Sequence, residues 1–231
     1  MTGSLQNLLA DSPPFAYMDA AARSDFATVG RVEAFESGAE VFYERQAPDA
    51  VLVVLSGVVY ICTYEAEGRR VIEAVLAPVE SFGWLSLVAP SHRSLSAIAG
   101  GRTELMTVGS RDVMAVLNRH PRAWQAVARF LAERLRRTLA SQRALAGFPL
   151  DRRIAFVLCQ TFRIGQAGLQ PLQELALSQE DIASMTATSR QSVNRQLRAW
   201  AANGLVALGY NSLAVRNPEA LLRLALAEPP P

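Results

Sequence analysis

The fold of the C-terminal half is decided by one stretch, Ser178-Gln179-Glu180-Asp181-Ile182-Ala183-Ser184-Met185-Thr186-Ala187-Thr188-Ser189-Arg190-Gln191-Ser192-Val193-Asn194-Arg195-Gln196-Leu197-Arg198-Ala199-Trp200. Ser178 and Asp181 stand three residues apart and form a capping box, which predicts the start of a short helix. Residues 185–188 have the length of the turn that joins two helices. A second helix is expected over residues 190–202, capped by Ser189 or Thr188. The stretch therefore predicts a helix-turn-helix.

The second helix has an apolar face and a polar face. Val193, Leu197 and Trp200 follow an i, i+4, i+7 spacing, which predicts that they are buried. The polar side chains then project outward, mostly at the N-terminal end, which is the end of a recognition helix that reaches base edges. Arginine pairs with guanine, glutamine and asparagine pair with adenine, and hydroxyl groups suit phosphate. The side chains expected to contact DNA are Ser178, Thr188, Ser189, Arg190, Gln191, Ser192, Asn194, Arg195 and Arg198.

A β-hairpin is predicted directly after these helices. Residues 205–208 and 213–216 are strand-like and flank the turn Gly209-Tyr210-Asn211-Ser212. A helix-turn-helix match alone also fits an ordinary helical pair. The hairpin adds the wing of a winged helix and favours double-stranded DNA as the partner.

The charge is divided unequally along the chain. The whole sequence carries a net charge of +2, but residues 1–110 carry −6 (7 − 13) and residues 111–231 carry +8 (16 − 8). A basic C-terminal half agrees with nucleic-acid binding. All 23 basic residues are arginine. Compositional bias of the genome explains this best, and selection for bidentate phosphate contacts is the alternative.

Several classes of protein are excluded by composition. Cys62 and Cys159 cannot form a disulfide framework or a four-thiolate metal site. His92 and His120 are too few and too scattered for a metal enzyme on a cupin-like roll, so no metal site and no catalytic residue are expected. We expect no signal peptide and no membrane span, and hence a cytoplasmic protein.

The N-terminal half is predicted to be β-rich. Short strand-like runs fill residues 29–108, with turn signals such as Ser37-Gly38 and Gly100-Gly101 between them. This spacing favours an antiparallel sandwich or barrel, so the fold class is α+β. Residues 1–20 are expected to be irregular, with a short helix over residues 19–26.

A long helix is predicted between the two halves. Ser110 is expected to cap a short helix, and Pro121 to begin a long one that ends near Ala146. Its spacing of 4, 3, 4, 3 residues indicates a heptad seam. The helix either packs on its own domain or pairs with a second copy, and we favour a parallel homodimer. The seam consists of Trp124, Ala128, Leu131, Leu135, Thr138, Gln142 and Leu145.

Three domains follow from these patterns. Residues 1–110 form the β-rich domain with its N-terminal helix, residues 111–147 the short helix and the long dimerisation helix, and residues 148–231 the winged helix-turn-helix. The family resemblance described next implies that the first domain is a β-roll that senses an effector.

The combination of β-rich half, long helix and the run Ser189-Arg190-Gln191-Ser192-Val193-Asn194-Arg195 resembles the CRP/FNR superfamily of bacterial transcription regulators. The resemblance covers roughly residues 25–225, and the family motif reads Ser-Arg-Glu-Thr-Val-x-Arg. It implies that Arg190 and Arg195 read guanine, and that Asn194 is a second specificity position. Gln191 replaces the glutamate that accepts a hydrogen bond from cytosine, so a different half-site is expected. The resemblance also implies a double-stranded β-roll (jelly-roll-like), a pseudo-palindromic DNA site and RNA polymerase as a candidate partner.

The resemblance also suggests an effector site in the roll. Phe82-Gly83-Trp84-Leu85 and Arg93-Ser94 keep the family's ten-residue spacing from Gly83 to Arg93, and Thr138 matches a residue that contacts adenine. Arg93 with Ser94 would bind a phosphate, or Arg93 forms only a salt bridge. Trp84 replaces the glutamate that accepts the ribose hydroxyl, which argues against a cyclic nucleotide. The alternatives are another effector, or a ligand-independent roll filled by Trp84.

Two other functions are less consistent with the sequence. A cyclic-nucleotide-binding regulatory subunit without a DNA role predicts an intact glutamate and no wing. Iron–sulfur sensing requires a cysteine cluster, and an exposed loop position explains His92 better than haem binding.

Overall fold

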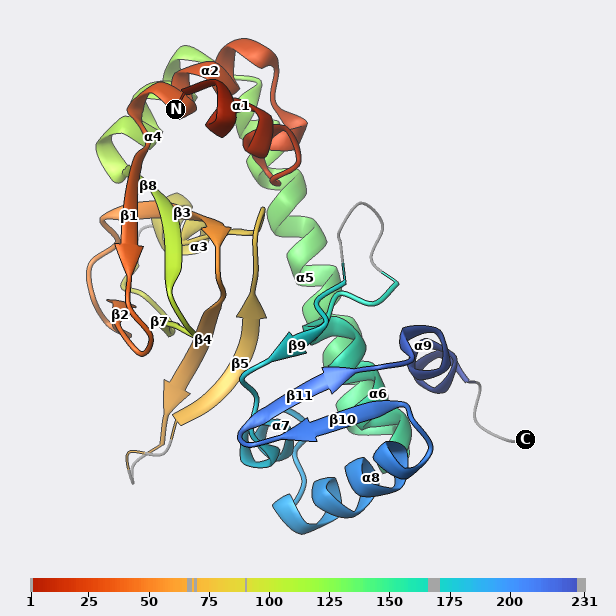
Figure 1. Ribbon diagram of the computed structural model, residues 1–231. Helices are drawn as coiled ribbons and strands as arrows, with labels where there is room; N and C mark the ends of the chain where they lie inside the picture. Colours follow the sequence, from red (N-terminus) through yellow and green to blue (C-terminus); the bar gives the residue numbers. More distant parts are fainter. Residues whose placement is uncertain (1, 66–67, 69, 90, 166–170, 228–231) are drawn as a thin grey trace. The chain divides into compact units, whose positions relative to one another are not determined.

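The computed structural model describes residues 2–65, 68, 70–89, 91–165 and 171–227. The chain divides into two compact units, residues 1–136 and 137–231. The long helix α5, Ala123–Gly147, begins in the first unit and ends in the second (Figure 1). Across the described part of the chain, no helix is both long and apolar enough to cross a lipid bilayer.

The first unit contains an antiparallel β-roll made of two four-stranded sheets. One sheet has the order β1-β8-β3-β6 and the other β2-β7-β4-β5. The prediction of an antiparallel sandwich is therefore confirmed. The strands are β1 Arg31–Phe35, β2 Glu40–Phe42, β3 Ala50–Ser56, β4 Val59–Tyr64, β5 Arg70–Leu76, β6 Ser81–Phe82, β7 Ser96–Ala99 and β8 Thr103–Gly109.

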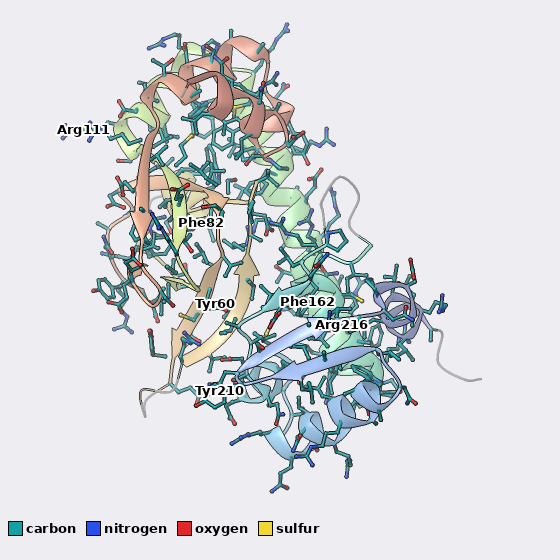
Figure 2. The ribbon with its side chains drawn as sticks, viewed as in Figure 1. Tyr60, Phe82, Arg111, Phe162, Tyr210 and Arg216 are labelled. Atoms are coloured by element: carbon teal, nitrogen blue, oxygen red, sulfur yellow. The ribbon has the colours of Figure 1, made fainter. Side chains whose placement is uncertain are left out.

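Strand β3 is buried on both faces. Its residues Val51 and Val53 belong to a core shared with helices, whereas Leu52 and Val54 belong to the core between the two sheets. Successive side chains of a strand point to opposite faces, so one apolar run serves two cores. Phe82 packs in the core between the sheets (Figure 2).

A layer of helices covers one sheet of the roll. It comprises α1 Thr2–Ala10, the 3₁₀ turn η1 Phe15–Tyr17, α2 Ala20–Val29, α4 Ser110–Arg119 and the first turns of α5. The expectation that residues 1–20 are irregular was wrong. Burial of Leu9 and Phe15 in this core stabilises a segment whose local propensity is weak. Tyr17 also donates to Glu133 of α5 over 2.6 Å.

The sequence also misplaced two helix starts and did not predict the short helix α3. Ser110 is the first residue of α4 rather than its cap, and α5 begins at Ala123 rather than Pro121. Helix α3, Trp84–Val88, was not predicted, because five residues carry too little periodicity. It follows Gly83, whose φ of +88° favours glycine.

The second unit is a small α+β domain. Helices α6 Leu150–Thr161 and α9 Pro218–Leu226 accompany α7 Gln179–Met185 and α8 Arg190–Ala202. Its sheet has the antiparallel order β10-β11-β9, formed by Val206–Gly209, Ser212–Val215 and Glu174–Leu175. The predicted helix-turn-helix and hairpin are both present.

An acid-sensitive link joins α2 to the end of α4. One carboxylate oxygen of Asp25 accepts from Arg119 over 2.6 Å and lies 2.9 Å from His120 Nε2. These two partners, His120 first, lower the pKa of Asp25 from its usual 3.8. A carboxylate whose folded-state pKa is depressed stabilises the fold above its unfolded pKa, and this stability is lost as the pH falls through the folded pKa.

We expect Asp25→Asn to lower the free energy of unfolding at pH 7, and we expect its difference from wild type to become smaller toward pH 3, because the wild-type carboxylate loses its stabilising effect as the pH falls below 3.8 and through its lowered folded-state pKa. Urea unfolding from pH 7 to pH 3 measures the difference. A difference that stays constant over this range would contradict the assigned role of Asp25.

Candidate nucleic-acid interface

Helix α7 begins with the predicted capping box. Ser178 Oγ accepts from the Asp181 backbone over 3.1 Å, and Asp181 Oδ2 accepts from the Ser178 backbone over 2.9 Å. Ser178 Oγ also donates to Asp181 Oδ2 over 2.7 Å. These bonds satisfy amide groups that the helix leaves free. They also hold the start of α7 in a fixed conformation.

The turn between α7 and α8 is tight and internally bonded. Thr186 is buried, and its hydroxyl donates to the Ile182 carbonyl over 2.6 Å. The Thr188 amide donates to the Ala183 carbonyl over 3.0 Å. Between them, the exposed Ala187 has a φ of +47°, in the left-handed region that disfavours side chains. The turn thus fixes how α8 leaves α7.

Helix α8 is capped and oriented by its own sequence. Ser189, rather than Thr188, is the N-cap, and its hydroxyl accepts from the Ser192 amide over 3.2 Å. Val193, Leu197 and Trp200 are all buried, as the spacing predicts. This burial fixes which side chains of α8 face solvent.

The solvent face of α8 is basic and polar. Arg190, Gln191, Arg195 and Arg198 are exposed, and so is Ser189. Asn194, expected to project outward with them, is instead half-buried, and its Oδ1 atom is buried without a hydrogen-bond partner. Ser178, Thr188 and Ser192 are also half-buried. The structure therefore gathers the arginines and Gln191 on the open face and places Asn194 at its border.

The wing ends in a two-residue turn. Gly209 pairs with Ser212 across the hairpin, leaving Tyr210 and Asn211 at the tip. Asn211 has a φ of +50°, and Tyr210 is 96% exposed. Figure 2 shows Tyr210 at the end of the hairpin. The sequence indicated this turn but did not single out Tyr210, because periodicity does not report exposure at a loop tip.

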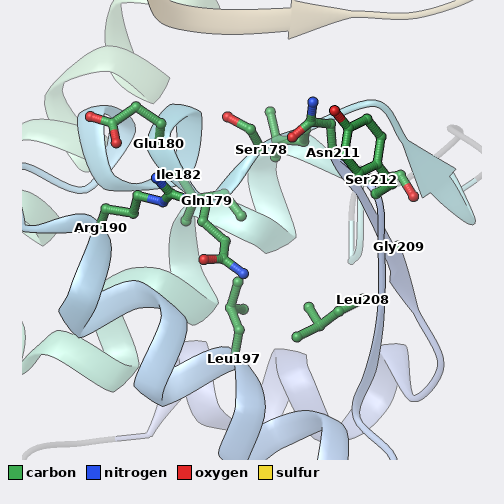
Figure 3. A pocket seen from close by; sticks show the side chains of 12 residues that line it. Ser178, Gln179, Glu180, Ile182, Arg190, Leu197, Leu208, Gly209, Asn211 and Ser212 are labelled. Atoms are coloured by element: carbon green, nitrogen blue, oxygen red, sulfur yellow. The ribbon is translucent and has the colours of Figure 1, made fainter.

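An open groove of about 460 Å³ lies between the wing, the start of α7 and α8. Gln179, Glu180 and Arg190 line it from the helices, and Leu208 and residues 209–212 line it from the wing. In the view of Figure 3 the Gln179 side chain extends toward Leu197, and Leu208 lies on the side of the wing. Gln179 was not among the side chains expected at the interface, because it lies outside the recognition helix.

In the first unit, Arg93 is buried in the roll, with 2% of its side chain exposed. Its guanidinium donates to the Ala50 carbonyl over 2.6 Å and to the Gly83 carbonyl over 3.1 Å, and lies 3.4 Å from Asp49 Oδ1. Burial lowers the pKa of Arg93, and Asp49 partly compensates. Arg93 therefore bonds to acceptors of the protein itself.

One face of the Arg93 guanidinium is covered by an aromatic ring. The guanidinium carbon lies 4.3 Å from the centre of the Phe42 ring, within the range of a cation–π contact. The Nε atom of Arg93 is buried and has no hydrogen-bond partner. Arg93 does form a salt bridge, to Asp49, as one of the two alternatives predicts, but it does so from a buried position and with further hydrogen bonds to backbone carbonyl groups.

Trp84 lies on the other side of the sheet from the interior of the roll. Its indole belongs to the helical core, with ring centres 5.5 Å from Phe15 and 6.4 Å from Phe26. Its Nε1 donates to Ser81 Oγ over 3.0 Å. The hypothesis that Trp84 fills the space of an effector inside the roll is therefore wrong.

The remaining residues expected at an effector site are dispersed. Phe82 is buried between the sheets, Gly83 is half-buried, and Leu85 and Ser94 are exposed. Thr138 is exposed on α5, in the second unit. Within the roll, Gly83 packs so closely that an added Cβ would lie 2.7 Å from Arg93. The first unit thus brings together Gly83 and Arg93.

Most of the predicted helix seam is open to solvent in the single chain. Leu135 is 59% exposed, Ala128, Thr138 and Gln142 are exposed, and Leu145 is half-buried. Trp124 and Leu131 are partly covered by the helical core of the first unit. Leu139, absent from the predicted seam, is 44% exposed. Helix α5 therefore carries an uncovered apolar stripe.

The geometry defines a winged helix-turn-helix in one unit and an antiparallel sensor-like roll in the other. Family models agree with this division. A Crp-like helix-turn-helix domain matches residues 152–224, and a cyclic nucleotide-binding domain matches residues 32–120.

Curated relatives match most of the chain. The "Cyclic AMP receptor protein" of Thermus thermophilus is 32% identical over 191 residues, 83% of this chain and 86% of that protein. The nitrogen fixation regulation protein FixK of Azorhizobium caulinodans is 29% identical over 202 residues, which are 86% of this chain and 80% of that protein. The chain belongs to the CRP/FNR superfamily of transcription regulators.

Solved structures share the fold. The catabolite activator protein of Thermus thermophilus is 29% identical, covers 93% of this chain and 98% of its own, and gives a TM-score of 0.51. FixK2 from Bradyrhizobium japonicum, at 22% identity, covers 87% of this chain and 100% of its own, with a TM-score of 0.72.

We expect Ala187→Gly to stabilise the second unit by about 1 kcal/mol, because glycine removes the penalty of the left-handed turn. Thermal unfolding measures the gain, and Ala199→Gly, at an exposed helical position of α8 before its last turn ends at Ala202, serves as a control with the opposite sign. An Ala187→Gly variant less stable than wild type would contradict the strain assigned to Ala187.

Proposed function

We propose that two copies of this chain bind a pseudo-palindromic site in double-stranded DNA, each inserting α8 into the major groove. The observation that carries the proposal is the arrangement of α8. One face is buried through Val193, Leu197 and Trp200, while Gln191, Arg195 and Arg198 face solvent together. Such a helix presents base-reading groups without exposing its apolar face.

The side chains on α8 have distinct proposed roles. Arg195 and Arg190 carry guanidinium groups that can pair with O6 and N7 of guanine, and Gln191 can pair with adenine. Ser189 and Thr188, at the start of the helix, suit phosphate. The half-buried Asn194 would reach a base only through its amide nitrogen, because its Oδ1 atom is buried. Arg198 lies about one turn further along α8 and would contact a phosphate of the DNA backbone.

We expect Arg195→Ala to weaken binding to a selected DNA site by about 1–3 kcal/mol while changing binding to an unrelated duplex much less, because a base contact is lost. Titrations of both duplexes at one fixed salt concentration measure this. Arg223→Ala removes the same charge from the exposed face of α9 and should leave discrimination unchanged. Equal losses on both duplexes would contradict base reading by Arg195.

The uncovered stripe on α5 supports a dimer. Leu135 and Leu139 lie one turn apart and are both largely exposed, in line with the seam that includes Thr138 and Gln142. Pairing two such helices would remove this apolar surface from water. It would also give the two-fold symmetry that a pseudo-palindromic site requires.

We expect Leu135→Arg to convert a dimer into a monomer of 25.1 kDa, because a charge would be buried in the helix pair. Light scattering after size-exclusion chromatography gives the mass. Leu85→Arg is the matched control, since Leu85 on α3 has the same 59% exposure, and it should leave the mass at twice 25.1 kDa. A wild-type chain that is already monomeric would contradict the proposed dimer.

For the sensor half, we propose that the roll does not bind a cyclic nucleotide, although the family model of the cyclic nucleotide-binding domain matches it. Arg93 already bonds to Asp49, Ala50 and Gly83, and Phe42 covers its face. Trp84 offers no carboxylate to a ribose hydroxyl. The free Nε–H group of Arg93 remains a donor for an effector with a different acceptor.

Calorimetry with cyclic AMP on wild type and on Asp49→Asn tests this proposal. We expect no binding heat from wild type at millimolar nucleotide, because a phosphate would have to break the bonds that Arg93 makes to protein acceptors. Micromolar binding to wild type would contradict the proposal. Asp49→Asn, which removes one competing charge, shows whether Asp49 is what closes the site.

The proposed setting is the cytoplasm, where the regulator would meet DNA and RNA polymerase. Membership of the family supports both points. The acidic first half and the basic second half agree with a regulator that contacts DNA only through its C-terminal unit.

A further inference from the structure

The wing is uncharged. Residues 206–215 read Val-Ala-Leu-Gly-Tyr-Asn-Ser-Leu-Ala-Val and contain neither an acidic nor a basic side chain. Nonspecific affinity for DNA comes mainly from basic groups that neutralise phosphates. A wing that touches DNA must therefore use neutral groups, and the feature that stands out is Tyr210.

Tyr210 is presented rigidly. The hairpin is paired over four residue pairs from Val206 with Val215 to Gly209 with Ser212, and β11 pairs in turn with β9. Only Tyr210 and Asn211 lie outside this ladder. At 96% exposure, the phenol has no packing role in the single chain. Because the backbone beneath it is already ordered, a contact made by Tyr210 would cost little conformational entropy.

Tyr210 also lines the open groove of about 460 Å³ between the wing and the two helices of the reading unit. Gln179 and Arg190 face it from the helical side, and Ser212 faces it from the wing. The floor and sides of the groove include the apolar Leu177, Ile182, Leu197 and Leu208. The amide, hydroxyl and guanidinium groups that line it beside these residues can donate to phosphate oxygens. Glu180 is the acidic member of this wall and would repel a phosphate.

We propose that this groove seats one sugar–phosphate strand of the DNA, and that Tyr210 is the contact residue of the wing. The phenolic hydroxyl donates to a phosphate oxygen, and the ring packs against the neighbouring sugar. This inference rests on the proposed DNA-binding function of α8 and extends DNA contact to the wing. A neutral contact of this kind adds affinity on every sequence and releases no counterion.

The effect of Tyr210 is thus separable from that of an arginine. Loss of Tyr210 should weaken binding to a selected site and to an unrelated duplex by the same factor. It should also leave unchanged the slope of log affinity against log salt, which counts neutralised phosphates. Glu180→Gln should act in the opposite direction and tighten binding, most at low salt, because it removes a charge that repels phosphate.

The experiment measures the dissociation constants of wild type, Tyr210→Ala, Tyr210→Phe and Tyr43→Ala for both duplexes between 50 and 200 mM salt, the range in which phosphate contacts are counted. We expect Tyr210→Ala to raise both constants about tenfold, and Tyr210→Phe by less, since it loses only one hydrogen bond. Tyr43 is 54% exposed in the first unit, and Tyr43→Ala should match wild type. Thermal unfolding checks that each variant is folded.

Three results would overturn the inference: an affinity of Tyr210→Ala for both duplexes equal to that of wild type, a changed slope of log affinity against log salt, or a loss of affinity confined to the selected site. If the first result were accompanied by a loss of transcription with RNA polymerase, it would assign Tyr210 to a protein contact instead. Wild-type protein that binds no duplex at all would overturn the proposed function as well, which distinguishes the two failures.

Discussion

Burial of one face of α8 is the constraint on which the function of this protein depends. Val193, Leu197 and Trp200 pack into the second unit, so the helix cannot rotate without exposing apolar surface to water. The orientation of Arg195 and Gln191 follows from that burial and needs no contact of their own. The bonded turn at Thr186 and the cap at Ser189 fix where the helix begins. A reading surface is thereby formed before any DNA is present.

A corresponding constraint governs the first unit. Alternate side chains of strand β3 point into the roll and into the helical layer. A shift of this strand by one residue would exchange the two sets of side chains, so both cores depend on its register. The interior Arg93 bonds to the carbonyl of Ala50 on this strand, while Trp84 packs on the opposite side. The two residues that the sequence placed together in an effector site therefore belong to different cores.

The sequence predicted those parts whose signals are local. The capping box at Ser178, the apolar spacing on α8 and the two-strand wing were all predicted from short-range patterns, and the antiparallel roll from strand spacing. Helix α1 was missed because its stability comes from burial of Leu9 in the helical core, which sequence neighbours do not reveal. The hydrogen-bond partners of Arg93 lie 10 to 44 residues away along the chain. The family spacing placed Gly83 near Arg93, but no local pattern indicated that Arg93 donates to carbonyl groups of the protein itself.

Other features were beyond the sequence for a different reason. The burial of the Asn194 oxygen and the exposure of Tyr210 depend on where α8 and the wing pack within the second unit. Helical periodicity assigned Asn194 to the polar face, but it lies at the edge of that face, where neighbouring side chains cover most of it. Periodicity gives the direction of a side chain, whereas tertiary packing decides its exposure.

The central claim is that paired recognition helices read two half-sites, and selection from a pool of random duplexes tests it most directly. The recovered sequences are expected to share an inverted repeat whose half-sites are centred about one helical turn, roughly 10 base pairs, apart. Two chains should bind each such duplex. Recovery of no common sequence at low salt, or of a single half-site bound by one chain, would contradict the claim.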